Sequence, residues 1–171
     1  MVSSPNWRTR SESINILSYL IKNSGVTFLN DKNTKIVIDY LKDKASSVRK
    51  EAVWLIIQII DQHGQPWAEK NIIPKIIPMF KSQTFIHRET ILLALEQLIP
   101  KLSADCLCKQ IFSNVFHLAQ DPVENVRMSV CVALGAIYPY IPKEKDSIRK
   151  TLKTLKDDRD QDVKDMATKI L

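Results

Sequence analysis

The sequence predicts an all-α protein, an α-solenoid in which helix pairs stack side by side. Its 171 residues are 44% hydrophobic and include only 3 glycines and 8 prolines, a composition that suits helices and disfavours sheets with many tight turns. Short polar segments that end in a basic residue recur at a nearly constant interval along the chain. Amphipathic runs follow these segments, with apolar residues three and four positions apart. Together these three observations indicate a helical repeat array.

The interval between the polar segments defines the repeat. The basic residues that end the segments lie 39 residues apart in the first four copies and 37 in the last, and they are Arg10, Arg49, Arg88, Arg127 and Lys164. A period near 39 with two helices per unit is typical of HEAT repeats, in which each pair buries its apolar face by stacking on its neighbours. We therefore expect residues 1–171 to form a single array of about five HEAT repeats, with the first and last incomplete. The turn centres are expected near residues 4–10, 43–49, 82–88, 121–127 and 158–164.

Each turn is expected to join the first helix of a pair to the second. First helices are predicted near residues 31–42, 68–81, 104–120 and 143–157. Second helices follow the turns, and their apolar positions share one face: Ala52, Leu55, Ile56 and Ile59 after Val48, and Val130, Ala133, Leu134 and Ile137 after Val126. Gly25 and Gly64 are predicted to end second helices, because glycine tolerates the left-handed conformation of a helix C-cap. Trp54 and Trp67 are interpreted as structural.

Composition and charge disfavour several classes of function. The formal net charge is +6, but the excess is concentrated in residues 1–50 and is interspersed with acids, so we expect no nucleic-acid partner. No apolar stretch approaches the roughly 20 residues of a membrane span, so we expect no membrane partner. Three cysteines make a poor disulfide framework, and the chain does not start with a secretory signal. We expect a cytoplasmic location, with the nucleus as an alternative.

The sequence predicts no catalytic or metal site. The candidates are its cysteines and histidines: Cys106, Cys108, Cys131, His63, His87 and His117. None lies in a nucleophile elbow or a Gly-rich turn, and Cys106 and Cys108 have no second pair at zinc-ligand spacing. We expect these two cysteines to be packing residues and His87 to be a partly buried structural histidine. The protein is therefore expected not to be an enzyme and to need neither cofactor nor metal.

The repeated basic residues are predicted to form a structural ladder of ion pairs. Asp43 and Asp121 lie six residues before Arg49 and Arg127, so each carboxylate can receive a guanidinium across its turn or from the neighbouring repeat. An anion-binding ladder is the alternative. The residues of the predicted ladder are Arg10, Asp43, Arg49, Arg88, Asp121, Arg127, Asp158 and Lys164.

The outer bend of each turn is the predicted interaction surface. Its central position, three residues before the repeated basic residue, holds in order Trp7, Ser46, Phe85, Glu124 and Gln161. Equivalent positions of a regular solenoid line up along one edge, so we expect Trp7 and Phe85 on a common ridge, flanked by Arg8 and Asn125. Exposed Trp and Arg are favoured anchors at protein interfaces, although Trp7 in a first helical turn could instead pack inward.

Several motifs resemble one known family. They are Asn6–Arg10, Trp67–Ala68 followed by 72–75, His87–Arg88, 121–127 and 160–164. In this order and at nearly this spacing, they are similar to the last repeats of the scaffold (A) subunit of protein phosphatase 2A. The related regulatory subunit 1 of protein phosphatase 4 is also similar, most closely at residues 43–49 and 157–160. The resemblance covers almost the whole chain and does not distinguish between the two families.

The resemblance implies a non-catalytic scaffold that holds a serine/threonine phosphatase catalytic subunit, of the 2A or 4 type, along its turn ridge. The matching partner-binding residues are Trp7, Arg8, Ala45, Ser46, Phe85, Val123, Glu124 and Asn125. The scaffold protein of that family has bulkier side chains where this chain has Ala45 and Ser46, and an aromatic hydroxyl where it has Phe85. The family's N-terminal repeats, which bind variable regulatory subunits, have no counterpart here. We therefore expect a fragment or a short isoform that binds a catalytic subunit without recruiting regulatory subunits.

Two other classes of function stay open. Tubulin-binding TOG domains are HEAT arrays with a Trp in the first turn, and the basic N-terminal part of the chain would suit acidic tubulin. Such domains need basic residues on several successive turns, which Ser46, Phe85 and Glu124 do not supply. A generic HEAT adaptor that binds other regulatory proteins is the third alternative.

Overall fold

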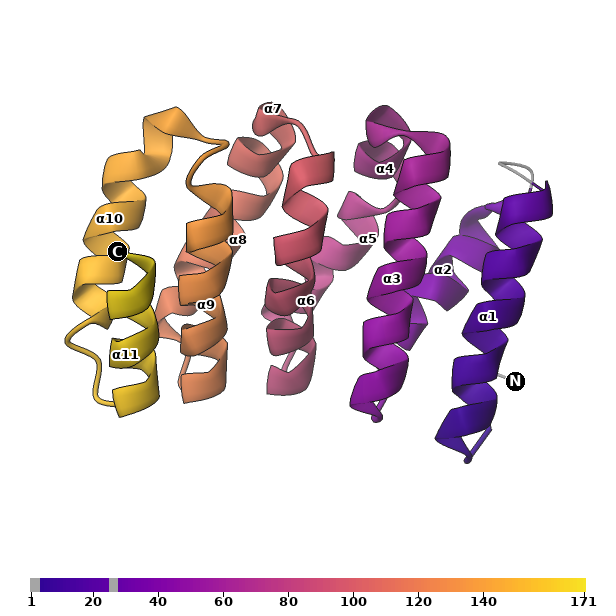
Figure 1. The fold of residues 1–171 in the computed structure, drawn as a ribbon, viewed down its shortest axis with the longest axis horizontal. Coiled ribbons are helices and arrows are strands. Elements are labelled where there is room, and N and C mark those ends of the chain that lie inside the picture. Colours follow the sequence, from indigo (N-terminus) through magenta and orange to yellow (C-terminus); the bar gives the residue numbers. More distant parts are fainter. Residues whose placement is uncertain (1–3, 25–27) are drawn as a thin grey trace. The chain divides into compact units, whose positions relative to one another are not determined.

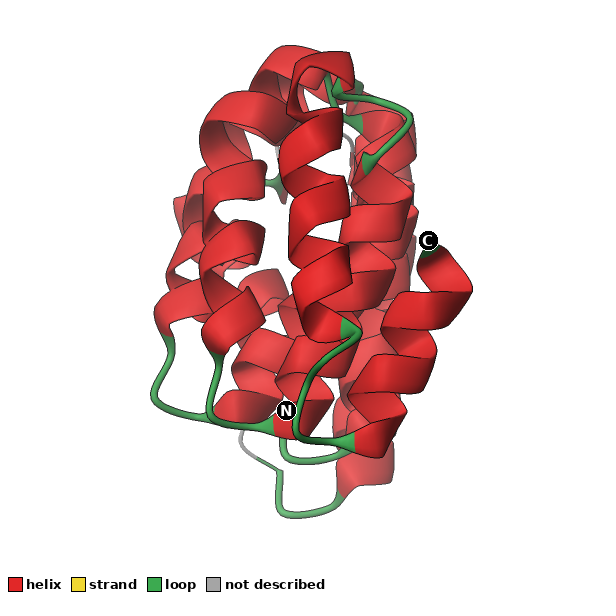
Figure 2. Ribbon diagram, turned by 90° about the vertical axis from the view of Figure 1, so that its left-hand side faces the viewer, coloured by secondary structure: helices red, strands yellow, loops and turns green. Residues whose placement is uncertain are grey.

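A computed structural model of the protein describes residues 4–24 and 28–171, and in these ranges every regular element is a helix (Figures 1 and 2). The predicted all-α class is confirmed. The chain divides into two compact units, Met1–Ile76 and Ile77–Leu171, hereafter unit 1 and unit 2. No described helix is both long and apolar enough to span a lipid bilayer.

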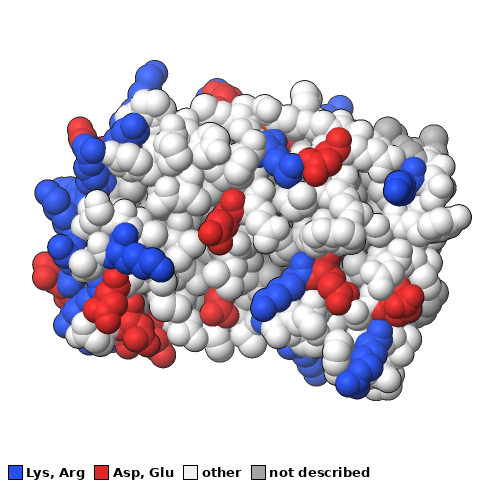
Figure 3. Space-filling view, in the orientation of Figure 1, with Lys and Arg blue, Asp and Glu red and all other residues white. Residues whose placement is uncertain are grey.

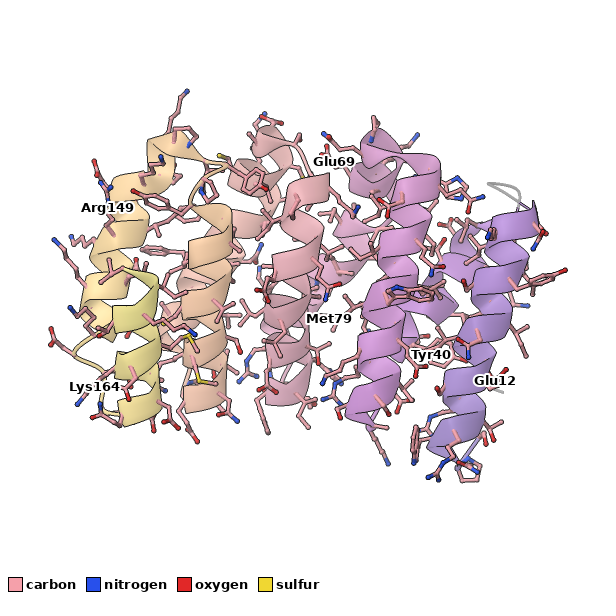
Figure 4. The ribbon with its side chains drawn as sticks, in the orientation of Figure 1. Glu12, Tyr40, Glu69, Met79, Arg149 and Lys164 are labelled. Atoms are coloured by element: carbon pink, nitrogen blue, oxygen red, sulfur yellow. The ribbon has the colours of Figure 1, made fainter. Side chains whose placement is uncertain are left out.

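Unit 1 consists of the described helices α1 (Trp7–Ser24), α2 (Asp31–Tyr40), α3 (Ser46–His63), α4 (Gln65–Asn71) and α5 (Ile73–Ile76). Helices α1 and α3 run side by side, and α2 packs on α3 (Figure 1). The amide oxygen of Asn30 accepts the N–H of Asn33 at 3.0 Å and caps the start of α2. Tyr40 of α2 is seen between α1 and α3 in Figure 4 and is 1% exposed, so it belongs to the core of the unit.

Gly64 separates α3 from α4. Its φ of 84° and ψ of 165° lie in a region that residues with a Cβ rarely adopt, and its N–H donates to the carbonyl of Ile60 at 2.8 Å. The predicted helix end at Gly64 is confirmed. The equivalent prediction for Gly25 lies outside the described residues.

Unit 2 is built around three second helices: α6 (Phe85–Leu98), α9 (Glu124–Ile137) and α11 (Gln161–Ile170). Helix α9 packs against both of the others, as Figure 1 shows. The first-helix segments are η2 (Ile77–Lys81), the run α7 (Ala104–Cys106), η4 (Leu107–Phe112), α8 (Ser113–His117) and η5 (Leu118–Gln120), and the pair η6 (Pro142–Glu144) and α10 (Lys145–Leu155). The short turn η3 (Ile99–Lys101) extends α6. Gly135 allows α11 close to α9, since a Cβ there would lie 2.7 Å from Cγ2 of Ile170.

The first helices are less regular than the sequence analysis expects. The predicted helix over residues 68–81 is divided into α4, α5 and η2, because Pro74 and Pro78 have no N–H to donate and their rings disturb the preceding turn. The predicted helix over residues 104–120 does start at Ala104, where the Ser103 hydroxyl caps the N–H of Cys106 at 3.1 Å. It then passes through a π-helical turn, η4. No feature of the sequence in this segment predicts the π-helical turn.

The prediction that Trp54 is structural is wrong. Its side chain is 53% exposed, whereas its neighbours Val53 and Leu55 are 8% and 1% exposed. The exposure of Trp54 follows from its position around the helix axis. The buried face of α3 consists of Ala52, Leu55, Ile56 and Ile59, and Trp54 lies outside this face. Trp67 is half-buried and its ring lies 5.3 Å from that of His63.

One further apolar face is exposed in unit 1. Ile16, Tyr19 and Leu20 lie on α1 and are 42%, 69% and 36% exposed. At the equivalent positions of α3, Leu55 and Ile59 are buried.

Candidate interaction surface

The turns that precede the second helices form one edge of each unit, hereafter the turn ridge. The central ridge position is exposed in every copy: Trp7 and Ser46 in unit 1, and Phe85, Glu124 and Gln161 in unit 2. Trp7 is 39% exposed and Phe85 is 37% exposed. In unit 2 the turns before α6, α9 and α11 lie along its lower edge in Figure 1. The alternative in which Trp7 packs fully inward is therefore not observed.

In the first four turns, the repeated arginine bonds to a backbone carbonyl of its own turn. One guanidinium nitrogen, Nη1, donates to the carbonyl oxygen six residues earlier in the chain. The four bonds are Arg10 to Ser4 at 2.7 Å, Arg49 to Asp43 at 2.9 Å, Arg88 to Ser82 at 2.7 Å and Arg127 to Asp121 at 2.8 Å. These bonds satisfy carbonyl groups that the turn itself leaves without a backbone partner.

Three of these arginines also reach the aspartate of the next repeat. In each pair Nε and Nη2 donate to the two carboxylate oxygens, the bidentate geometry that arginine favours. The distances are 2.6 and 2.8 Å for Arg10 with Asp43, 2.6 and 2.9 Å for Arg88 with Asp121, and 2.8 and 2.8 Å for Arg127 with Asp158. Of the two routes considered from the sequence, the carboxylate thus receives its guanidinium from the neighbouring repeat and not across its own turn.

Each paired aspartate also organises its own turn. One carboxylate oxygen accepts the backbone N–H two residues later, from Ala45 at 2.8 Å, Val123 at 2.9 Å or Asp160 at 2.9 Å. The carboxylates and guanidinium groups are therefore satisfied by one another and by the backbone. Such groups hold consecutive repeats together and have little capacity left for an external anion.

Two members of the predicted ladder differ from the others. Among the described residues, Arg49 pairs with no carboxylate, and the sequence has Ser82 where the other inner repeats have aspartate. Lys164, which lies on α11 in Figure 4, likewise forms no ion pair with a described carboxylate. The ladder is therefore made of three inter-repeat pairs.

The pairs lower the pKa of the carboxyl groups that they contain. Hydrogen bonding from Arg10 lowers the pKa of Asp43 despite the opposing effect of desolvation, and Arg127 does the same for Asp158. A group whose pKa is lower in the folded state stabilises the fold above its unfolded pKa. That stabilisation is lost as the pH falls through the folded pKa.

Asp158 should therefore contribute less to the free energy of unfolding at acid pH. We expect Asp158→Asn to lower the free energy of unfolding near neutral pH by about 1–3 kcal/mol, since it removes the charge that Arg127 faces. The difference from wild type should shrink as the pH falls below the ordinary aspartate value of 3.8. Urea unfolding at a series of pH values measures this, with Asp157→Asn, an exposed neighbour, as the matched control. A difference that stayed constant into acid would contradict the role of this pair.

A groove opens beside Trp7 in unit 1, with a volume of about 770 Å³. Pro5, Trp7 and Ala45 line it with apolar surface, and Lys42 and Lys44 line it with cationic side chains. The guanidinium of Arg8 stacks over the Trp7 ring, 4.7 Å from its centroid, on the exposed side of the turn. Of the partner-binding residues expected in unit 1, the structure thus brings Trp7 and Ala45 into one groove, with Arg8 and Ser46 exposed beside it.

The remaining expected partner-binding residues lie on the ridge of unit 2. Glu124 and Asn125 are exposed at the start of α9, and Val123 before them is half-buried. Phe85 is exposed at the start of α6. Lys42 and Lys44 were not predicted as site residues. The alternation Lys42-Asp43-Lys44 was a visible signal, since the two lysines flank the aspartate that pairs with Arg10.

Cysteines and histidines are the candidates for catalysis or metal binding in the part of the chain that the structure describes. No group of three or more His, Cys, Asp or Glu side chains is arranged to hold a metal ion there. Burial raises the pKa of the Cys131 thiol to about 12, so this residue is a poor nucleophile. Cys106 is buried as expected, but Cys108 is half-exposed and so is only partly a packing residue. His87 is half-buried, with Nδ1 2.9 Å from the Ser82 hydroxyl.

The sequence is similar to one repeat family and to known proteins. A family model described as HEAT repeat matches residues 111–141, which include α8, the following turn and α9. Over 118 residues, 63% of the chain, the sequence is 33% identical to the regulatory A subunit of protein phosphatase PP2A from Saccharomyces cerevisiae, and it covers 19% of that protein. The protein of the same name from Schizosaccharomyces pombe is 31% identical over 80 residues, 47% of the chain and 14% of that protein. The chain thus spans a fifth or less of the length of these relatives.

Solved structures at lower identity share the fold. The MAST/Orbit N-terminal domain is 22% identical, with a TM-score of 0.64 over 99% of this chain and 74% of that one. A chain from the structure named "TOG-tubulin binding specificity promotes microtubule dynamics and mitotic spindle formation" is 17% identical, with a TM-score of 0.64 over 99% and 71%. A designed armadillo repeat protein has a TM-score of 0.54. The predicted α-solenoid is confirmed, and the chain is a HEAT-repeat protein with moderate similarity to the PP2A regulatory A subunit.

Proposed function

We propose that this chain is a non-catalytic scaffold piece that binds a serine/threonine phosphatase catalytic subunit, of the 2A or 4 type, through its turn ridge. The observation that carries the proposal is the position of Trp7, which is exposed on the ridge with Arg8 stacked on its ring. Trp and Arg are the residues that most often dominate binding energy at protein interfaces. The similarity to the PP2A regulatory A subunit supports a phosphatase as the partner.

The ridge is suited to this role because its shape is fixed before a partner arrives. The ion pairs between repeats are bidentate and largely screened from water, so the exposed residues sit on turns that are already ordered. A preformed surface loses less conformational entropy on binding. In unit 2, Phe85, Val123, Glu124 and Asn125 are the ridge residues that would contact the catalytic subunit. In unit 1, the small side chains of Ala45 and Ser46 would reduce the contact. A cytoplasmic location accompanies the proposal, because free cysteines suit a reducing compartment.

A pulldown with purified catalytic subunits tests the proposal. The bait is this chain, and the prey are the catalytic subunits of phosphatases 2A and 4, with tubulin as the alternative partner. We expect Trp7→Ala/Arg8→Ala to lose about 2 kcal/mol or more of binding free energy, roughly thirtyfold in Kd. Trp54→Ala is the matched control, because Trp54 is also an exposed tryptophan of unit 1 but lies on α3 away from the turns.

Circular dichroism confirms that each variant keeps its helices. Retention of a phosphatase by wild type and Trp54→Ala, together with its loss in the Trp7/Arg8 variant, would support the proposal and identify the enzyme. Equal retention by all three proteins would remove the turn ridge as the binding surface. Binding of tubulin alone would replace the phosphatase by the TOG-type alternative.

A further inference from the structure

The turn ridge of each unit has a groove beside an inter-repeat ion pair. The groove of unit 1 has the Arg10–Asp43 pair in its wall, and a smaller groove of unit 2, about 460 Å³, has the equivalent Arg127–Asp158 pair. In both grooves this pair is bidentate, so its charges are compensated within the protein. The difference between the two grooves therefore lies in the side chains around the pair.

In unit 1 these surrounding side chains are apolar and cationic. Trp7 has the largest apolar side chain among the residues that line the groove, and Lys42 and Lys44 are exposed on either side of the paired Asp43. Neither lysine forms an ion pair with a carboxylate among the described residues. Two uncompensated positive charges thus lie beside an exposed aromatic surface.

In unit 2 the equivalent positions are less basic and lack the aromatic ring. Glu124 occupies the position of Trp7 but is not among the residues that line this groove, and Asp157 and Arg159 occupy the positions of the two lysines. The guanidinium of Arg159 donates to the carbonyl oxygen of Pro122 at 2.8 Å, so this cation is bonded to another residue of the groove. Acidic side chains are dense at the lower edge of unit 2 in Figure 3, at the end where the turn before α11 lies. The groove of unit 1 is therefore the larger and more basic of the two, and the groove of unit 2 is smaller and includes acidic residues.

We propose that the groove of unit 1 binds an acidic peptide segment of a partner protein, with one apolar side chain packed on Trp7 and carboxylates next to Lys42 and Lys44. The inference rests on the proposed function for the use of this ridge, and it adds the chemistry of the segment that binds. Burial of an apolar side chain on the indole supplies most of the affinity. The two lysines select acidic over basic segments and orient the bound segment, which is the usual contribution of charges at an interface rim.

A peptide titration tests this proposal without any phosphatase. The probe is a short fluorescent peptide with one leucine between two pairs of glutamates, followed by fluorescence anisotropy. We expect wild type to bind it and to bind less tightly as salt is added. Lys42→Glu/Lys44→Glu should weaken binding by roughly tenfold or more. Lys32→Glu/Lys35→Glu changes the same charge on exposed residues of α2 and should leave binding unchanged.

Other probes and a milder variant complete the design. A peptide with lysines in place of the glutamates, a peptide with serine in place of leucine, and a short single-stranded oligonucleotide should all bind at least several-fold more weakly. Lys42→Gln/Lys44→Gln removes the charges without placing an acid beside Asp43, and it should also weaken binding. This variant tests the role of the two lysines even where the charge-reversed variant does not fold. The inference would be overturned by absence of binding by folded wild type, by binding of the lysine peptide or oligonucleotide as tight as that of the glutamate peptide, or by groove variants that bind the glutamate peptide as tightly as wild type does. Because the titration contains no phosphatase, none of these results alters the outcome of the pulldown.

Discussion

Replacing Arg88 by methionine is expected to lower the free energy of unfolding by about 3–5 kcal/mol, because it leaves the carboxylate of Asp121 buried without its cation. Both side chains are shielded from water, at 11% and 3% exposed, and Asp121 is the most enclosed carboxylate of the three inter-repeat pairs. The substitution also removes the bond that Arg88 donates to the Ser82 carbonyl at 2.7 Å. Urea unfolding followed by circular dichroism measures the change.

The repeat supplies its own control for this experiment. Arg49 occupies the equivalent position and bonds to turn carbonyls, but it pairs with no carboxylate in the described part of the chain. Arg49→Met should therefore cost about 1–2 kcal/mol, the value of the turn bonds alone. Adding Asp121→Asn to Arg88→Met should recover part of the stability, since the buried charge is then absent. Equal losses in the two arginine variants would show that the inter-repeat pair contributes little.

The turn positions could be predicted from the sequence because they follow from a local period. Each turn holds its arginine through a carbonyl six residues earlier, so its geometry is contained within one short segment. Trp7 and Phe85 are both exposed because each lies at the same position of its own turn. Equal spacing along the chain therefore corresponds to equivalent surroundings within each turn.

The partners of the aspartates could not be fixed in the same way. Asp43 is six residues from Arg49 and 33 from Arg10, and the sequence alone does not say that the more distant arginine is the one within reach. Which arginine reaches the aspartate depends on the distance and rotation between consecutive repeats. The packing of the second helices determines both. The groove of unit 1 was missed for the same reason, because it forms only when the first two turns lie side by side.

The sequence also did not predict which residues of a continuous apolar run face the solvent. Trp54 stands between buried residues in sequence, and a continuous apolar run offers no polar position to mark the solvent side. The run Ile91–Leu95 on α6 presents the same ambiguity, with five apolar residues in succession. In the structure Leu93 is 48% exposed, whereas Leu92 and Leu95 are fully buried.

This run permits a prediction with two chemically identical substitutions. Leu95→Ala should lower the free energy of unfolding by about 2–5 kcal/mol, because it removes buried methyl groups and leaves a cavity next to α9. Leu93→Ala should change it by about 0.5 kcal/mol or less, because the side chain is half in water and its loss opens no cavity. Both variants have the same change in helix propensity, so only burial differs between them. Thermal and urea unfolding of the two proteins side by side measure the difference. Similar losses in both would mean that Leu93 is covered in the folded protein, for example by association of the chain with itself, and a dilution series by analytical ultracentrifugation would then detect that association directly.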